Sequence, residues 1–204
     1  MKRMTLALVA IAVAVGGICS ARAQTTAAPA TPAAPAAPAA GAAPAVPAVS
    51  SYQVRGTDVE TVDGIVAALY DVISGPAGKP RDWDRMRSLF APEGRLMAVG
   101  ARPDGSFGLR AMSVEDYITR NSKAFATMGF FEREAARTAE TFGQVAHVFS
   151  TYESRHAADD AKPFQRGINS IQLYNDGKRW WIVNVLWRGE DAHLALPERY
   201  LKSH

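Results

Sequence analysis

Residues 164–188, FQRGINSIQLYNDGKRWWIVNVLWR, contain the pattern that most constrains the fold of this chain. Two runs rich in Ile, Val, Leu, Tyr and Trp flank the tetrapeptide Asn-Asp-Gly-Lys at residues 175–178. Asp-Gly is typical of a tight hairpin turn, because both central positions of that turn take a positive φ. The segment therefore predicts a long β-hairpin.

The N-terminus has the features of an export signal. Lys2 and Arg3 precede an apolar run at residues 6–15, and small residues flank Arg22 at the two positions that a signal peptidase recognises. We expect a signal peptide at residues 1–23 and a mature chain that begins at Gln24. The protein is then periplasmic or secreted, with no membrane attachment after cleavage.

Two alternatives to a cleaved signal stay open. A transmembrane helix would need roughly 20 apolar residues, and the run here is shorter. A lipoprotein anchor at Cys19 would need a small residue before the cysteine, where this chain has Ile18. Cys19 is the only cysteine, so after cleavage the domain has no disulfide and no thiol nucleophile.

Residues 24–50 are almost entirely Ala and Pro. Recurrent prolines prevent helix growth and no large side chain is present to be buried, so we expect a disordered, extended linker. The chain has 23 basic residues, and removing Lys2, Arg3 and Arg22 leaves 20 against 20 acidic residues. A neutral mature protein does not favour binding to nucleic acid or to anionic membranes.

Residues 51–190 are long enough for one domain, followed by a C-terminal tail at residues 191–204. Thr57 and Glu60 have capping-box spacing and begin a helical pattern that ends at residue 75, Asp82 begins a second, and Ser113 a third. A short strand is predicted at residues 95–99, and two long strands at residues 130–141 and 144–155. Helices followed by long strands indicate an α+β fold, with an antiparallel sheet packed on about three N-terminal helices.

This order of elements is similar to the nuclear-transport-factor-2-like (SnoaL-like) superfamily. The segments that carry the resemblance are VAHVFSTYESR, RGINSIQLYNDG and RWWIVNVLW, at residues 145–155, 166–177 and 179–187. The resemblance covers residues 59–188 and is to exported bacterial members with no assigned activity. It implies a cone-shaped roll, in which a curved sheet and the helices enclose a pocket, and frequent dimers through the outer sheet face. The fold hosts isomerases, cyclases, dehydratases and non-catalytic binders, so the function must be argued from the site.

Alternation along the strands predicts which side chains face the pocket. A two- or four-residue turn that pairs Tyr174 with Arg179 places Asn169 opposite Asn184, on the same face as Trp180. Two facing amides on an apolar surface must bond to each other, to water or to a ligand. On the preceding strand we expect Ser150 and Tyr152 to face inward, because small residues there leave room for a cavity.

The predicted ligand-binding residues are therefore Ser150, Tyr152, Asn169, Trp180 and Asn184. The opposite face of the hairpin carries Trp181 and Trp187 among polar residues, a mixture that is typical of a subunit interface. We expect a homodimer through this outer face. A three-residue turn would shift the register by one residue and exchange the two faces.

The catalytic residues, if there are any, are not determined by the sequence. A mechanism of the ketosteroid-isomerase kind needs a carboxylate base and an oxyanion donor in one apolar cavity. Tyr152 is a candidate donor, and Asp116 or a strand glutamate is a candidate base. We interpret Glu132, Glu134, Glu140 and Glu153 as solvated cross-strand partners of nearby arginines. The four histidines lack the spacing of metal ligands, and no metal or cofactor is predicted.

Three hypotheses follow from the sequence. The first is an exported, non-catalytic dimer whose cone binds a small, mostly apolar ligand. The second is a cofactor-free isomerase, cyclase or dehydratase that acts on a cyclic carbonyl compound. The third is a protein-interaction module that uses the Trp-rich outer sheet face.

Overall fold

The computed structural model describes residues 52–202; the predicted signal peptide and linker lie outside these residues. The strands are β1 (Phe90–Ala101), β2 (Phe107–Ser113), β3 (Phe131–Phe142), β4 (Val145–Arg155), β5 (Gln165–Asn175) and β6 (Trp180–Gly189). The helices are α1 (Gly56–Val59), α2 (Val62–Ile73), α3 (Trp83–Leu89), α4 (Val114–Phe125) and the short 3-10 helix η1 (Glu198–Tyr200).

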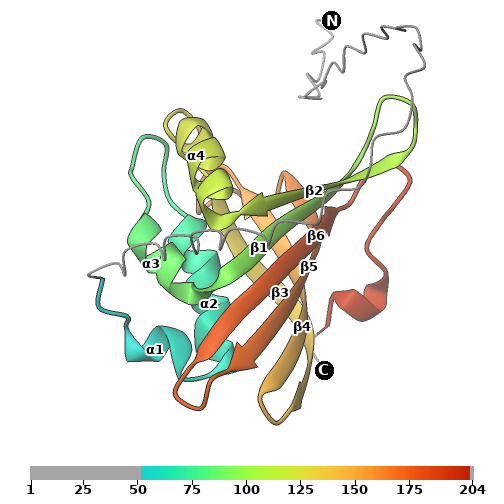
Figure 1. The fold of residues 1–204 in the computed structure, drawn as a ribbon. Helices are drawn as coiled ribbons and strands as arrows, with labels where there is room; N and C mark the ends of the chain where they lie inside the picture. Colours follow the sequence, from blue (N-terminus) through green and yellow to red (C-terminus); the bar gives the residue numbers. More distant parts are fainter. Residues whose placement is uncertain (1–51, 203–204) are drawn as a thin grey trace, which may run out of the picture. The chain divides into compact units, whose positions relative to one another are not determined.

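The six strands form one sheet in the order β2-β1-β6-β5-β4-β3. All neighbours are antiparallel except β1 and β6, which run parallel. The sheet is curved, and helices α1 to α4 lie on one side of it while the segment with η1 lies on the other (Figure 1). The predicted α+β class is confirmed, with β1 and β2 longer than the short strand expected there.

The first predicted helix is two helices. Its expected capping box at Thr57 and Glu60 is wrong: α1 begins after Arg55 without a side-chain cap, and the chain breaks before α2. Thr61 caps α2 instead, because its Oγ1 accepts a hydrogen bond of 2.9 Å from the Gly64 amide. This break lets α2 take its own direction across the sheet.

The other two helix starts are as predicted. The Asp82 carboxylate accepts a 3.0 Å bond from the Arg85 amide at the start of α3. Ser113 and Asp116 form a reciprocal capping box at the start of α4. Asp116 is thereby held at the exposed helix terminus, with its Oδ2 on the Ser113 amide at 3.0 Å.

The register of the hairpin differs from the prediction at the turn and again at Val183. The turn places Tyr174 opposite Trp181, not opposite Arg179, and a bulge at Val183 follows, because Leu173 pairs with Ile182 while Gln172 pairs with Asn184. One extra residue in β6 reverses the alternation of every side chain after it. Asn169 is therefore opposite Trp187, and the predicted pairing of Asn169 with Asn184 is wrong.

The core lies between α2 and the concave face of the sheet. Its fully buried side chains include Ile65 and Val66 of α2, Val148 of β4, and Ile171 and Leu173 of β5. Trp187 also packs against this core, on the face opposite to the one predicted for it. The convex face is partly covered by the chain itself, because the ring of Tyr200 lies 5.3 Å from that of Phe149 on β4.

None of the helices between residues 52 and 202 has the length and apolar character needed to cross a bilayer.

Candidate functional site

A chain of polar side chains crosses the core between α2 and the sheet. The Tyr70 hydroxyl lies 2.7 Å from Ser150 Oγ and accepts a 3.1 Å bond from Asn169 Nδ2. Ser150 Oγ in turn donates to Glu134 Oε1 at 2.6 Å. Because Ser150 uses its one proton on Glu134, the Tyr70 hydroxyl must be the donor to Ser150. The direction of the bonds therefore runs from Asn169 through Tyr70 and Ser150 to Glu134.

Glu132 holds the inner end of this chain. Its Oε1 accepts from Asn169 Nδ2 at 3.3 Å and its Oε2 from Ser154 Oγ at 2.8 Å. The side-chain amide of Asn169 thus donates to both the Glu132 carboxylate and the Tyr70 hydroxyl. Four elements, α2, β3, β4 and β5, meet at this cluster, so its geometry depends on the fold as a whole.

Burial raises the pKa of Glu132 from 4.5 to about 7. The cause is loss of hydration around the charged form, and the hydrogen bonds from Ser154 and Asn169 act in the opposite direction. The carboxyl group therefore exchanges its proton close to neutral pH. A group with this pKa can donate a proton, accept one, or sense the pH.

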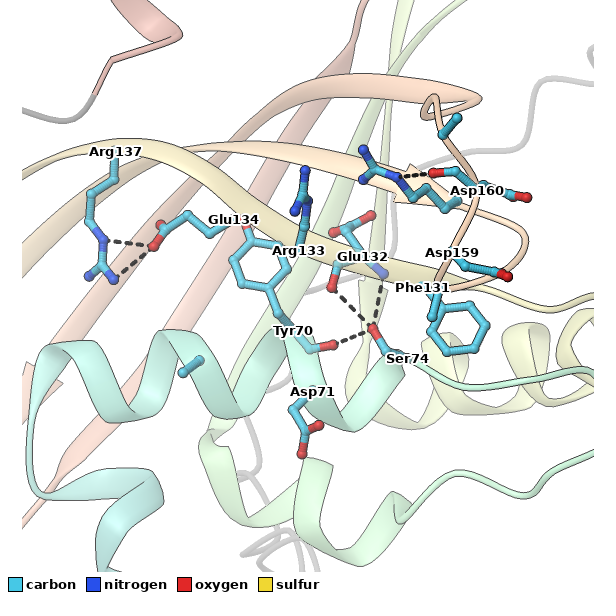
Figure 2. Close-up of a pocket in the computed structure, with 14 residues that line it drawn as sticks. Tyr70, Asp71, Ser74, Phe131, Glu132, Arg133, Glu134, Arg137, Asp159 and Asp160 are labelled. Carbon is cyan, nitrogen blue, oxygen red and sulfur yellow. Dashed lines mark hydrogen bonds and ion pairs between the residues drawn. The ribbon is translucent and has the colours of Figure 1, made fainter.

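The outer end of the chain reaches the surface through an ion pair. A bulge in β3 at Ala135 brings Glu134 and Arg137 to the same face, where the two side chains are joined at 2.7 Å. Figure 2 shows these two side chains facing each other. Arg137 also bonds Asp63 of α2 at 2.8 Å, so the pair links the edge strand to the helix.

Tyr152 and Tyr117 place two further phenols near Glu132. Both side chains are at least nine-tenths buried. Burial, followed by the charge of Glu132, raises the pKa of each phenol above its usual range, so both stay protonated. They are available as donors to an added oxygen atom.

Glycine makes the position of Tyr152 possible. Gly167 and Gly189 pair with each other on β5 and β6. A Cβ atom on Gly167 would lie 2.6 Å from the Tyr152 hydroxyl, too close for any real contact. The Tyr152 phenol therefore occupies space that is free only because residue 167 is a glycine without a side chain.

A pocket of about 650 Å³ opens between α2, the edge strand β3 and the loop after β4. Figure 2 shows its labelled side chains, with Ser74, the residue after α2, joined to the backbone of Glu132. Its size suits a small molecule. The residues that line it are Ala67, Tyr70, Asp71, Ser74, Phe131, Glu132, Arg133, Glu134, Arg137, Arg155, Ala158, Asp159, Asp160 and Ala161.

The structure brings three of the five sequence-predicted site residues together. Ser150 and Asn169 are buried and bonded to Tyr70, and the buried Tyr152 lies on the same face. Trp180 is buried in the core at the far end of the hairpin. None of these four lines the 650 Å³ pocket. Their burial follows the predicted alternation, and their role in ligand binding stays a prediction.

Asn184 is not part of the cluster. The bulge at Val183 turns its side chain to the convex face, where its neighbour is Gln172. Nothing in the sequence marks this bulge, since neither glycine nor proline is present there. The predicted pair of inward-facing amides is therefore reduced to Asn169 alone.

The interpretation of the strand glutamates was wrong for Glu132, whose carboxylate faces inward and accepts from Ser154 and Asn169. Glu134 does pair with a nearby arginine, Arg137, and it also faces inward and accepts from Ser150. Glu153 does pair with arginines, accepting from Arg133 at 2.8 Å and from Arg155 at 2.9 Å. Asp116 is an exposed cap and does not face the core. A sequence signal for Glu132 exists: it pairs with Ser154, which shares the face of Ser150 and Tyr152.

Within residues 52–202, no group of three or more His, Cys, Asp or Glu side chains has an arrangement that could hold a metal ion.

Comparison with known proteins adds information about the fold. No family model matches the sequence, and no curated protein matches it. Solved structures that it resembles include an NTF2-like protein of unknown function from Silicibacter pomeroyi, 16% identical over 64% of this chain and 94% of that one, with a TM-score of 0.44. A similar protein from Pseudomonas aeruginosa is 15% identical over 61% and 90%, with a TM-score of 0.44.

A provisionally assigned dehydratase of the NTF2-like family, from Streptomyces avermitilis, is 15% identical over 67% of this chain and 98% of that one, with a TM-score of 0.48. These three neighbours are NTF2-like proteins. No activity follows from similarity at this level.

The raised pKa of Glu132 predicts a pH-dependent stability. In the unfolded chain the carboxyl returns to its ordinary pKa of 4.5, so the folded state binds the proton more tightly. This stabilisation is complete below pH 4.5 and is lost as the pH rises through about 7. Between pH 5 and pH 8, we expect the wild type to lose about 1–3 kcal/mol of unfolding free energy relative to Glu132→Gln.

Urea unfolding of both proteins at the two pH values measures this loss. Glu140→Gln, which changes an exposed glutamate of the same strand, is the matched control and should behave as the wild type. Parallel pH profiles for the wild type and Glu132→Gln would contradict the assignment.

Proposed function

We propose that the protein binds a small molecule in the pocket between α2, β3 and the loop after β4, without catalysing a reaction. One observation carries the proposal: Glu132 lines a pocket of suitable size, and its carboxyl group also belongs to the buried polar chain. A carboxyl group between a buried polar network and a pocket is stabilised by a ligand that supplies a polar partner. The location differs from the interior of the cone, which we expected from the sequence.

Apolar and polar groups in the pocket suit an amphipathic ligand. Ala67, Phe131, Ala158 and Ala161 offer apolar contacts, while Tyr70 and Ser74 are held by bonds within the protein. The other eight lining residues are charged, so a ligand meets polar as well as apolar groups there.

The binding proposal is tested by blocking the pocket from its exposed side. Ala67 lines the pocket and is exposed, so Ala67→Trp fills the space without disturbing the core. In thermal-shift screening of a metabolite panel, we expect this variant to lose the ligand responses of the wild type. Asn184→Leu, on the opposite face of the sheet, should keep them. Identical thermal-shift responses in Ala67→Trp and the wild type would show that the ligands bind outside this pocket.

A second candidate function is cofactor-free proton transfer next to a carbonyl group. It is favoured by the pKa of about 7 at Glu132 together with the buried, protonated phenols of Tyr117 and Tyr152. Glu132 as carboxylate would take a proton from the carbon next to the carbonyl, and a phenol would donate a hydrogen bond to the enolate oxygen. The protonated Glu132, after exchange of its proton with solvent, would then return a proton to another carbon or to the original one.

Deuterium incorporation separates this enzyme from a binder. Cyclohexanone incubated with the protein in D₂O should exchange its α-hydrogens faster than in buffer, at a rate that rises with pH and levels off above about 7. Glu132→Gln should abolish the enhancement, and Tyr152→Phe should lower it by roughly tenfold or more, the usual size of the loss of one oxyanion donor. Exchange no faster than the buffer rate would contradict the enzymatic function, and non-catalytic ligand binding would remain as the proposed function.

We also propose that the protein acts as an exported homodimer. Support for export comes from the signal-like N-terminus, and support for the dimer from an apolar row on the convex face. Phe142, Val145, Tyr174 and Trp181 are direct cross-strand neighbours on β3, β4, β5 and β6, and the first three are exposed. A second copy that packs on this row would cover it. Trp187, which we expected in the interface, belongs to the core.

Light scattering tests the dimer. Val145→Glu places a charge in the middle of the row, and we expect it to halve the measured mass. Thr138→Glu, at an exposed position of the edge strand outside the row, is the control and should leave the mass unchanged. An unaltered mass for Val145→Glu would exclude this face as the interface.

A further inference from the structure

Two arginines at one end of the pocket share a single carboxylate. Glu153 Oε2 accepts from Arg133 Nη2 at 2.8 Å and Nε at 3.1 Å, and from Arg155 Nη2 at 2.9 Å. Two positive charges therefore converge on one negative charge. This trio has one uncompensated positive charge, and repulsion between the two guanidinium groups disfavours it.

Arg155 has a donor without an acceptor. The residue is only 9% exposed, and its Nε donates to the carbonyl oxygen of Asp160 at 3.0 Å. In the described part of the chain, its Nη1 is buried and has no hydrogen-bond partner. A buried donor on a charged group that makes no bond costs about 1–3 kcal/mol or more, which an added acceptor would recover.

Most of the other charged groups of the pocket have partners of their own. Asp71 pairs with Arg85, and Glu134 with Arg137. The Asp160 carboxylate accepts from the amides of residues 156 and 157 in the loop. Asp159 makes no ion pair among residues 52–202. The uncommitted donors of the pocket are therefore at its Arg133 and Arg155 end.

From these contacts we propose that the Arg133 and Arg155 end of the pocket binds the carboxylate of a small, mostly apolar organic monoanion. This inference rests on the proposed binding function and names the ligand class. Guanidinium groups recognise carboxylates through paired N–H bonds. Asp159, Asp160 and Glu132 also line the pocket and oppose a second negative charge, so a dianion such as phosphate is excluded.

The apolar part of the ligand lies toward Phe131 and the alanines of the lining. The carboxylate meets the exposed Arg133 first, since that side chain is 67% exposed. The loop that carries Asp160 lies directly against the Arg155 guanidinium, so this loop must move outward for the carboxylate to reach the buried Nη1.

Calorimetric titration with matched acids and amides tests the proposal. The probes are benzoate, phenylacetate and hexanoate, each beside its neutral amide, and inorganic phosphate. We expect the wild type to bind at least one acid roughly tenfold more tightly than its amide, and phosphate not at all. Arg133→Gln, at an exposed position, should remove this preference and still bind the amide.

Arg155→Gln should have the same effect, and Arg133→Gln keeps the test decisive if the buried variant does not fold. Arg166→Gln removes an arginine that pairs with Glu190 outside this pocket and is the control. If the wild type bound an acid and its amide with equal affinity, the monoanion inference would be overturned. The proposed binding function would still hold if Ala67→Trp abolished that binding. Tight phosphate binding would also overturn it. Absence of binding by every probe and by the metabolite panel would overturn both.

Discussion

The structure depends on the burial of one carboxyl group between α2 and the sheet. Glu132 is an acceptor for Ser154 and Asn169, and Asn169 also donates to Tyr70, so helix and sheet are joined by bonds whose partners come from four elements. Buried polar groups are costly unless they are satisfied. Each member of the chain therefore fixes the next, and the sheet cannot slide past α2 without leaving donors or acceptors unpaired.

The same burial gives the site its chemistry. Loss of hydration raises the pKa of Glu132 toward neutrality, while the bonds from Ser154 and Asn169 keep the shift moderate. At the other end of this network, Glu134 and Asp63 both form ion pairs with the Arg137 guanidinium near the surface. One network therefore contains a proton-exchanging carboxyl on the inside and a fixed ion pair on the outside, with the pocket next to both.

Regular alternation made much of the fold predictable, and irregularities limited the prediction of the site. On β4 and β5 the strands alternate without interruption at the relevant positions, so the inward direction of Ser150, Tyr152 and Asn169 followed from the sequence. Bulges at Val183 and Ala135 have no local sequence signal, and the former moved Asn184 to the convex face. Glu132 was missed because a carboxylate on an edge strand is usually solvated, and its burial depends on α2, which is distant in sequence.

A carbon-detected NMR titration of the Glu132 side-chain carboxyl, assigned by the loss of its signal in Glu132→Gln, measures the central quantity directly. A midpoint near pH 7 is the result that a buried, hydrogen-bonded carboxyl predicts. A midpoint near the ordinary value of 4.5 would show a solvated carboxylate and would contradict both the network and the chemistry assigned to it.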